Sequence, residues 1–414
     1  MKFDCLVLGA GIIGVATALH LQKRGRFCAL VDRRPAAEET SYGNTGLIQS
    51  EAVLPYAFPR NIRAILTAAT NSGTDAHLHY SALPRIAPWL ISYWRHGSKH
   101  HVDRTARAAL PLLERCLSEH ELLMREAGIV DMLRRTGYIK LHRHQNTLDL
   151  DVAEQEMARD RFGVQFEVVD DRGLRDLEPH LIGEFAGAVH MVDPVSVDDP
   201  SAVGKAYAQL FQSNGGLFQT ADARTLEAVS GGWQVQTVNG PIVAQDCIIA
   251  LGPWSGEILK QLGVRVPLGT KRGYHMHYKA SGNASLSRPV LDSDYGYVLT
   301  PMRQGIRLTT GAEFARMSAP KTPVQLNRVE PIAKKLFPLV DRTERQAWLG
   351  NRPCLPDMLP MIGGIPGHPG LWANFGHQHH GFTLAAVTGR LITEILSDEP
   401  TFCDVQPYRV DRFW

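Results

Sequence analysis

Three observations predict an α/β protein that is α+β overall. The chain opens with an apolar strand, a glycine turn and a helix at residues 3–23, and a second apolar strand follows at residues 28–31. Apolar segments of strand length recur from residue 217 onward, and several of them have no helix between them. The opening unit is typical of a parallel sheet, and the later segments are typical of a β-rich domain. The order of the elements predicts that the two domains are interleaved along the chain.

Length and composition favour a globular protein of more than one domain. A chain of 414 residues exceeds one ordinary domain, so we expect two or three. Hydrophobic residues make up 44% and charged residues 21%, close to the globular average. The formal net charge is +2 without a block of like charge, so nucleic-acid binding is not expected.

One stretch, Phe3 to Leu21, has the apolar character of a signal or membrane segment. It contains Asp4, His20 and three glycines, and no cluster of positive charges precedes it. We interpret it as a buried strand that runs into a helix. We therefore expect no membrane-spanning helix and a cytoplasmic protein.

The glycine turn has the spacing of a dinucleotide fingerprint. Residues 9–14 read Gly-Ala-Gly-Ile-Ile-Gly between the first strand and the first helix. Gly9 permits the tight turn, Gly11 lets the backbone approach a pyrophosphate, and Gly14 allows close helix–strand packing. Asp32 ends the second strand and is placed to accept hydrogen bonds from a ribose. The pattern predicts a Rossmann-like domain that binds NAD or FAD, the alternative being a turn that packs and binds nothing.

The remaining elements follow from apolar spacing. Residues 83–128 show helical periodicity interrupted by prolines, and further helices are expected at 203–213, 324–336 and 382–396. Strands are expected at 134–142, 217–219, 233–238, 247–250, 274–278, 297–300, 306–310 and 371–374. His275 and His277 alternate on one strand, so both side chains are expected on the same face, toward solvent, and receive no role.

Four later segments carry a resemblance to a known family. They read ETSYGNTG at 39–46, IIALGPWS at 248–255, GNRP at 350–353 with PMIG at 360–363, and GH at 376–377 with GFTL at 381–384. Together with the glycine fingerprint they resemble, in order over nearly the whole chain, the D-amino-acid oxidase superfamily of FAD-dependent oxidoreductases. The resemblance is strongest to bacterial D-amino-acid dehydrogenases, and glycine oxidase and sarcosine oxidase are more distant. Gln378-His379-His380 departs from it, since relatives commonly have small residues there.

The resemblance implies a noncovalent FAD, because attachment through Cys354 is not expected. It implies an FAD-binding domain formed by residues 1–88, 150–262 and 345–414, and a substrate-binding domain formed by 89–149 and 263–344. A metal ion is not expected at the histidines of residues 377–380. The residues expected to bind FAD are Gly9, Gly11, Ile12, Ile13, Gly14, Asp32, Arg33, Ser41, Asn44, Gly46, Leu47, Ala223, Ala250, Gly252, Trp254, His377, Gly381, Phe382 and Thr383.

The implied reaction is hydride removal from the α-carbon of an amino or imino acid, which gives an imine. The flavin performs this chemistry, so no side chain is nominated as a catalytic acid or base. The resemblance of GNRP at 350–353 to the family's substrate-arginine segment makes Arg352 the expected clamp for the substrate carboxylate, and a guanidinium binds a carboxylate through two parallel hydrogen bonds. Arg272, Tyr274 and His380 are the other residues expected to contact the substrate.

Several alternatives stay open at this level. D-proline or cis-4-hydroxy-D-proline is the preferred substrate, because histidines near the flavin are able to hydrogen-bond a hydroxyl; a broad D-amino-acid range, sarcosine and glycine are alternatives. A NAD-linked dehydrogenase and a flavoprotein subunit of a multisubunit amine dehydrogenase are others, and the electron acceptor is a quinone or O2. Residues 84–101 combine aromatic and cationic side chains, which favours either a core helix or peripheral contact with the inner membrane.

Overall fold

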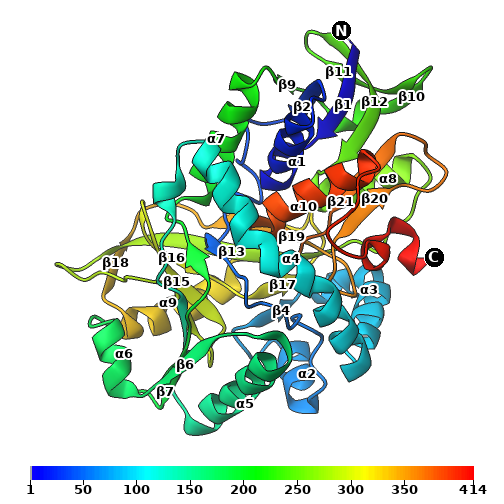
Figure 1. Cartoon of the computed structure of the whole chain (residues 1–414). Helices are drawn as coiled ribbons and strands as arrows, with labels where there is room; N and C mark the ends of the chain where they lie inside the picture. The colour runs from blue at the N-terminus through cyan, green and yellow to red at the C-terminus, as the bar shows by residue number, and fades with distance from the viewer. Residues whose placement is uncertain (1) are drawn as a thin grey trace.

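The computed structural model describes residues 2–414 and contains two large sheets. The first has eight strands in the order β10-β11-β12-β1-β2-β9, with β21 paired to β12 and β20 paired to β21. It occupies the upper part of the molecule in Figure 1, beside the N-terminus. Its strands are β1 (Lys2–Leu8), β2 (Cys28–Asp32), β9 (Leu217–Thr220), β10 (Glu227–Val229), β11 (Gly232–Thr237), β12 (Gly240–Ile249), β20 (Met361–Gly364) and β21 (Leu371–Phe375).

The parallel centre of this sheet is made of the most apolar stretches of the chain. β1 lies between β2 and β12, and Leu8 is opposite Val31 on one side and Ile249 on the other. These side chains are buried, as expected for parallel strands covered on both faces. Helix α1 (Ile12–Lys23) packs against α10 (Gly381–Leu396), and a Cβ at Gly389 would lie 2.9 Å from the backbone of α1. Glycine at this position therefore allows the two helices to approach closely.

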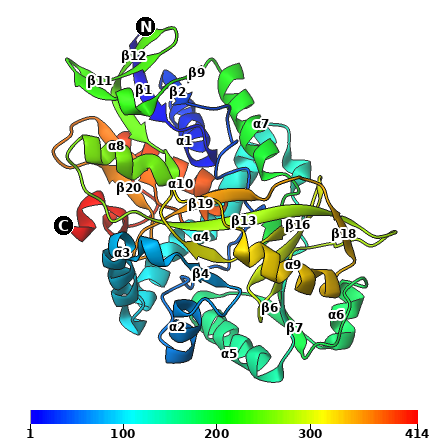
Figure 2. The same ribbon diagram turned by 180° about the vertical axis from the view of Figure 1, so that it is seen from behind.

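The second sheet has eleven strands in the order β4-β17-β13-β16-β15-β14-β5-β7-β6, with β18 and β19 also paired to β13. β13 is its long central strand and is antiparallel to both β16 and β19. Figure 2 shows α9 beside β13 and β16. The strands are β4 (Ala76–Leu78), β5 (Tyr138–His142), β6 (Phe166–Val169), β7 (Gly187–Met191), β13 (Gly269–Ala280), β14 (Val290–Asp292), β15 (Tyr297–Met302), β16 (Gly305–Thr309), β17 (Ala312–Phe314), β18 (Leu339–Arg342) and β19 (Trp348–Cys354).

A two-stranded sheet and the remaining helices complete the fold. α4 and α7 pack beside α1 and α10, and no helix in residues 2–414 is long and apolar enough to cross a membrane. The two short strands are β3 (Leu47–Ile48) and β8 (Val195–Ser196). The helices are α2 (Ile62–Ala69), α3 (Leu83–His96), α4 (Lys99–Glu126), α5 (Gln145–Phe162), α6 (Asp171–Leu177), α7 (Pro200–Ser213), α8 (Ser255–Gln261) and α9 (Val324–Leu336).

The helices expected at 203–213, 324–336 and 382–396 are present within a few residues of their predicted bounds. The division between the sheets, in contrast, does not follow the domain bounds expected from the sequence. β4, β6, β7 and β19 belong to the second sheet, although their residues were assigned to the FAD-binding domain. The reason is that strands join a sheet by pairing with distant partners, and this pairing leaves no mark in the local sequence.

Candidate active site

A cavity of about 2330 Å³ is lined by segments of both sheets. It extends from the glycine turn after β1, past the loop at residues 39–47, to β13, β17 and β19. The loop before α10 and residues 51–78 complete the wall. The volume and the mixed polar and apolar lining suit a ligand larger than an amino acid.

The glycine turn supplies the end of the cavity nearest the first sheet. Gly9 has φ +105°, and a Cβ there would lie 2.5 Å from the carbonyl oxygen of Ala250. A Cβ on Gly14 would lie 1.8 Å from the carbonyl oxygen of Gly9, so the third glycine is required for helix–strand packing. Gly11 directly precedes α1, and because it has no side chain its backbone is exposed at the cavity wall. The hydroxyl oxygen of Ser41 accepts a hydrogen bond from Ile12 N at 3.0 Å. The free N–H groups of the first helical turn suit a phosphate.

Asp32 lies at the same end, as the last residue of β2. Its carboxylate accepts from Ala10 N at 2.7 Å and from Arg34 N at 3.1 Å. Burial raises the pKa of this carboxyl, and the backbone hydrogen bonds oppose that rise. The guanidinium of Arg33 lies 4.4 Å from the ring centre of Trp254, and both residues line the cavity. This arrangement suits a ribose and a flat aromatic base.

The loop after Ser41 is held from the second sheet. Arg307 donates to the carbonyl oxygens of Tyr42, at 3.3 Å, and Asn44, and its Nε donates to His277 Nε2 at 2.9 Å. The other ring nitrogen of His277 hydrogen-bonds the carboxylate of Glu344. Burial lowers the pKa of Arg307 to about 10, so it remains charged at neutral pH. The chain of contacts fixes the shape of the loop.

The expectation that His275 and His277 face solvent is wrong. His275 is 1% exposed and His277 is 0% exposed. His275 stacks on Trp348 at 4.7 Å between ring centres, and a Cβ at Gly43 would collide with that tryptophan ring. The alternation on β13 was identified correctly, but this face of the strand is covered by the loop of residues 41–46.

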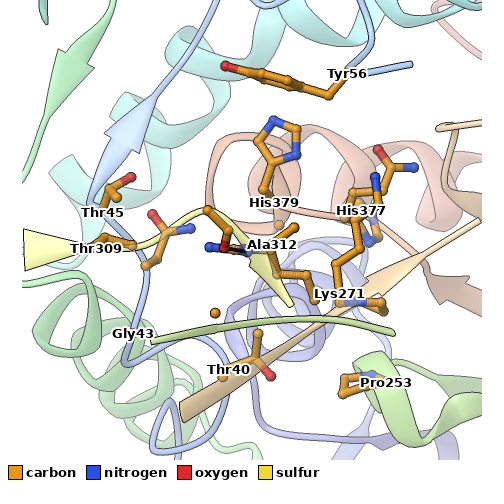
Figure 3. A pocket seen from close by; sticks show the side chains of 18 of the residues that line it. Thr40, Gly43, Thr45, Tyr56, Pro253, Lys271, Thr309, Ala312, His377 and His379 are labelled. Atoms are coloured by element: carbon orange, nitrogen blue, oxygen red, sulfur yellow. Dashed lines mark hydrogen bonds between the residues drawn. The ribbon is translucent and has the colours of Figure 1, made fainter. Parts of the chain in front are cut away.

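The loop before α10 contributes neutral histidines. Burial lowers the pKa of His377 to about 3 and that of His380 to about 4, and it also lowers the pKa of His379. His377 Nε2 lies 3.1 Å from Thr388 Oγ1. His379 lies in the cavity with its ring 4.9 Å from that of Tyr56, edge to face, as Figure 3 shows.

Arg352 projects into the cavity from β19. It is paired in register with Lys271 of β13, and its guanidinium covers Gly273, where a Cβ would lie 2.5 Å from Nη2. It donates to the carbonyl oxygens of Gly311 at 2.9 Å and Thr310 at 3.2 Å. Desolvation lowers its pKa. Within residues 2–414 it has no carboxylate partner, so part of its hydrogen-bonding capacity remains for a ligand.

Arg272 and Tyr274, unlike Arg352, contact a buried carboxylate, that of Glu313. The Nε of Arg272 lies 2.7 Å from Glu313 Oε2, both side chains are fully buried, and Arg272 is not part of the cavity wall. The hydroxyl of Tyr274, a residue that touches the wall, donates to Glu313 at 3.1 Å and accepts from Thr322 N at 2.8 Å. Successive side chains of a strand point to opposite faces. Lys271 and Arg272 therefore diverge, and the lysine is the one that reaches the cavity.

The structure brings most of the predicted site residues together. His380 lies instead in a small neighbouring pocket, and Thr383 bonds the backbone of Leu47 and Gln49. The predicted residues that line the cavity are Gly9, Gly11, Ile12, Ile13, Asp32, Arg33, Ser41, Asn44, Leu47, Ala223, Ala250, Gly252, Trp254, Tyr274, Arg352, His377, Gly381 and Phe382. Those outside its wall are Gly14, Gly46, Arg272, His380 and Thr383.

Several cavity residues with polar groups were not nominated from the sequence, among them Glu51, Tyr56, Lys271 and Tyr295. Burial raises the pKa of Glu51 to about 7. Lys271 had a signal, since it directly precedes Arg272, which was singled out. The strand pattern separates its two faces but does not say which face meets the cavity.

A dinucleotide turn on a largely parallel sheet, joined through one cavity to a second sheet that carries a half-buried arginine, defines a nucleotide-dependent enzyme. The chain matches the family model described as "FAD dependent oxidoreductase" over residues 4–395, and it belongs to this family. It is 28% identical to a D-amino-acid oxidase of Bradyrhizobium diazoefficiens over 98% of each chain. It is 29% identical to a D-amino acid dehydrogenase of Xylella fastidiosa over 99% of this chain and 94% of that protein. The fold is that of glycine oxidase from Geobacillus kaustophilus, with a TM-score of 0.75, 22% identity and 99% coverage of both chains.

The protein is thus an FAD-dependent oxidoreductase. The residues of the cavity fit FAD, because the glycine turn presents bare backbone and helix N–H groups where a diphosphate would lie. Asp32 and Trp254 suit the adenosine end, and the loops at 41–47 and 376–383 offer backbone groups for the flavin end.

Proposed function

We propose that this enzyme oxidises an α-amino or cyclic imino acid at its α-carbon, with Arg352 binding the substrate carboxylate. The observation that carries the proposal is the state of Arg352: a half-buried cation on the cavity wall that donates to the backbone carbonyl groups of Gly311 and Thr310 and has no carboxylate partner in the described chain. A cation that is partly withdrawn from water, and has no counter-ion, gains free energy when an anionic ligand pairs with it. The names of the curated relatives, D-amino-acid oxidase and D-amino acid dehydrogenase, support the same class of substrate.

Bound FAD supplies the hydride acceptor. The chain supplies position: Arg352 orients the carboxylate, and the buried side chains of His377 and Phe382 on the cavity wall exclude water from the reacting carbon. His377 and His379 remain uncharged, because burial lowers the pKa of both. They therefore do not compete with Arg352 for the carboxylate.

Within this class, D-proline and cis-4-hydroxy-D-proline are the first candidates. The Nε2 of His379 is buried, lines the cavity and has no hydrogen-bond partner within residues 2–414. A ring hydroxyl of the substrate would provide one. Sarcosine and glycine are the alternative substrates. Neither has a ring hydroxyl, so each would leave this nitrogen unpaired.

The test is anaerobic mixing of the purified holoenzyme with single compounds while the visible flavin absorption is followed. D-proline, cis-4-hydroxy-D-proline, other D-amino acids, their L-enantiomers, sarcosine and glycine form the panel. Rapid bleaching by at least one D-amino or imino acid is expected, and the absence of bleaching by all of them would contradict the proposal. Turnover by the isolated chain with an artificial acceptor, against turnover with O2, separates an autonomous dehydrogenase, an oxidase and a dependent subunit of a larger complex.

A peripheral membrane contact is a further proposal, carried by α2 and α3. Ile62 and Leu66 of α2 are 74% and 58% exposed, and Ile91 and Trp94 of α3 are 52% and 45% exposed. Arg60 stacks on Trp94 at 4.5 Å. Apolar groups beside cations suit the surface of an anionic bilayer. Flotation with anionic liposomes at low salt should carry the enzyme upward, and recovery only in the bottom fraction would leave these helices an ordinary protein surface.

A further inference from the structure

A second cation shares the cavity with Arg352. Lys271 is 8% exposed and lines the same cavity, where Figure 3 shows it together with His379. It is paired in register with Arg352 across two antiparallel strands, so both side chains leave the same face of the sheet. Neither cation forms an ion pair with a carboxylate in residues 2–414.

Uncharged groups, one hydroxyl and three aromatic rings, surround the ammonium of Lys271. Its Nζ donates to the hydroxyl of Tyr93 at 2.7 Å, and it lies 4.0 Å from the centre of that ring. The rings of Trp89 and Phe314 are 5.9 Å and 5.8 Å away. Aromatic rings attract a cation but leave its charge in place. One of the three N–H groups is used, which leaves donors for a ligand.

The protonation of Lys271 agrees with this geometry. Burial, and then the charge of Arg352, lower the pKa of Lys271 to about 8. The lysine is therefore still largely charged at neutral pH. An anion beside it would raise that pKa again and be bound in return.

Unlike Lys271, the other lysine of the cavity wall is paired with a carboxylate. Lys140 also lines the cavity, yet its Nζ lies beside the carboxylate of Asp151, which in turn lies 2.8 Å from His142. The diphosphate of FAD is expected at the glycine turn, on the first sheet, and does not explain the charges on β13 and β19. Two cations without a counter-ion line one cavity, and their electrostatic complement is a ligand with two anionic groups.

We propose, on the basis of the proposed function, that Lys271 forms a second anion site beside Arg352 and that the substrate carries two carboxylates. An acidic D-amino acid or a dicarboxylic imino acid fits this description, with the α-carboxylate on Arg352 and the distal carboxylate on Lys271. The pKa of His379 is lowered by burial and also by the charges of Arg352 and Lys271, and its Nε2 has no hydrogen-bond partner within residues 2–414. A hydroxylated imino acid is the competing occupant and is an outcome of the test.

The experiment compares matched acid and amide substrates with the holoenzyme. D-glutamate and D-aspartate are compared with D-glutamine and D-asparagine, which have the same shape without the distal charge, and with cis-4-hydroxy-D-proline. We expect kcat/KM for the better acid to exceed that of its amide by at least about tenfold, the effect of one charge-assisted hydrogen bond. Lys271→Met should remove this preference and leave the amide within about threefold, whereas Lys271→Arg should retain much of it.

Lys140→Met is the matched control, because it removes a cavity lysine whose charge is already paired; the acid-to-amide ratio should not change. A readout without turnover is titration of the resting holoenzyme with succinate and with acetate, followed by the flavin spectrum. Succinate should bind more tightly than acetate in the wild type, and this advantage should disappear in Lys271→Met. Flavin content and thermal unfolding confirm that each variant is folded, and Lys271→Arg keeps the test valid if the methionine variant is not.

The possible results separate the two proposals. If no amino or imino acid bleaches the flavin, the proposed function fails. If neutral amino acids or cis-4-hydroxy-D-proline are better than the acids, oxidation of amino acids stands and the second anion site is wrong. An equal loss for acid and amide in Lys271→Met, with no change in succinate binding, would also overturn it and assign Lys271 to the packing of Trp89 and Tyr93.

Discussion

Replacing Arg352 by lysine should damage substrate binding while leaving the cofactor in place. The substitution keeps a positive charge but removes the planar donors that hold a carboxylate in one orientation. One hydrogen bond to a charged group contributes about 1.5–3 kcal/mol. At about 1.4 kcal/mol for each factor of ten, kcat/KM should fall roughly tenfold to a hundredfold. Arg352→Ala should lose more, because the carbonyl groups of Thr310 and Gly311 also lose their donor.

The assay is anaerobic flavin reduction over a range of concentrations of the best substrate. FAD content should stay close to that of the wild type, because the expected phosphate and ribose contacts lie at the other end of the cavity. Amines without a carboxylate should be affected much less. Arg288→Lys is the control, since that arginine bonds Glu178 and the Thr136 carbonyl and is not part of the cavity wall. Near wild-type efficiency of Arg352→Ala would refute the clamp, and Lys271 would be the next cation to test.

Three further predictions concern the cofactor and the fold. Gly11→Val should abolish FAD retention, because its Cβ would start 3.4 Å from Ser41 Oγ and the branches would fill the phosphate space; a full flavin complement would show that the phosphate site is misplaced. Arg307→Met should free the loop of residues 41–46 and speed FAD loss on dialysis, whereas exposed Arg303→Met should not; equal retention by both would contradict the role given to the loop contacts. Burial lowers the pKa of His120 from its ordinary value of 6.5 to about 4. At a pH between these two values, His120 takes up a proton when the protein unfolds. The free energy of unfolding should therefore fall by up to about 3 kcal/mol as the pH drops through this range. Urea unfolding at a series of pH values measures it, and a slope unchanged in His120→Gln would assign the effect to other groups.

The cofactor end of the site was predictable from the sequence because it is built from consecutive residues. Gly9, Gly11 and Gly14 act through backbone geometry within one strand–turn–helix unit, and Asp32 follows at the end of the next strand. Local sequence dictates such a unit almost completely. The strong apolar periodicity of α9 and α10 was sufficient for the same reason.

The substrate end was decided by the tertiary structure. Whether Lys271 or Arg272 faces the cavity depends on which face of β13 meets the cavity and on the neighbouring strand β17, which brings Glu313 into register with Arg272. Glu313 neutralises Arg272, and it does so from β17, far along the chain. A strand's alternation divides its side chains into two sets, but only the packing of distant segments makes one set a buried ion pair and the other a binding site. The sequence therefore determined the nucleotide turn and its fold class, and the register of β13 with β19 and β17 decided which cations meet the ligand.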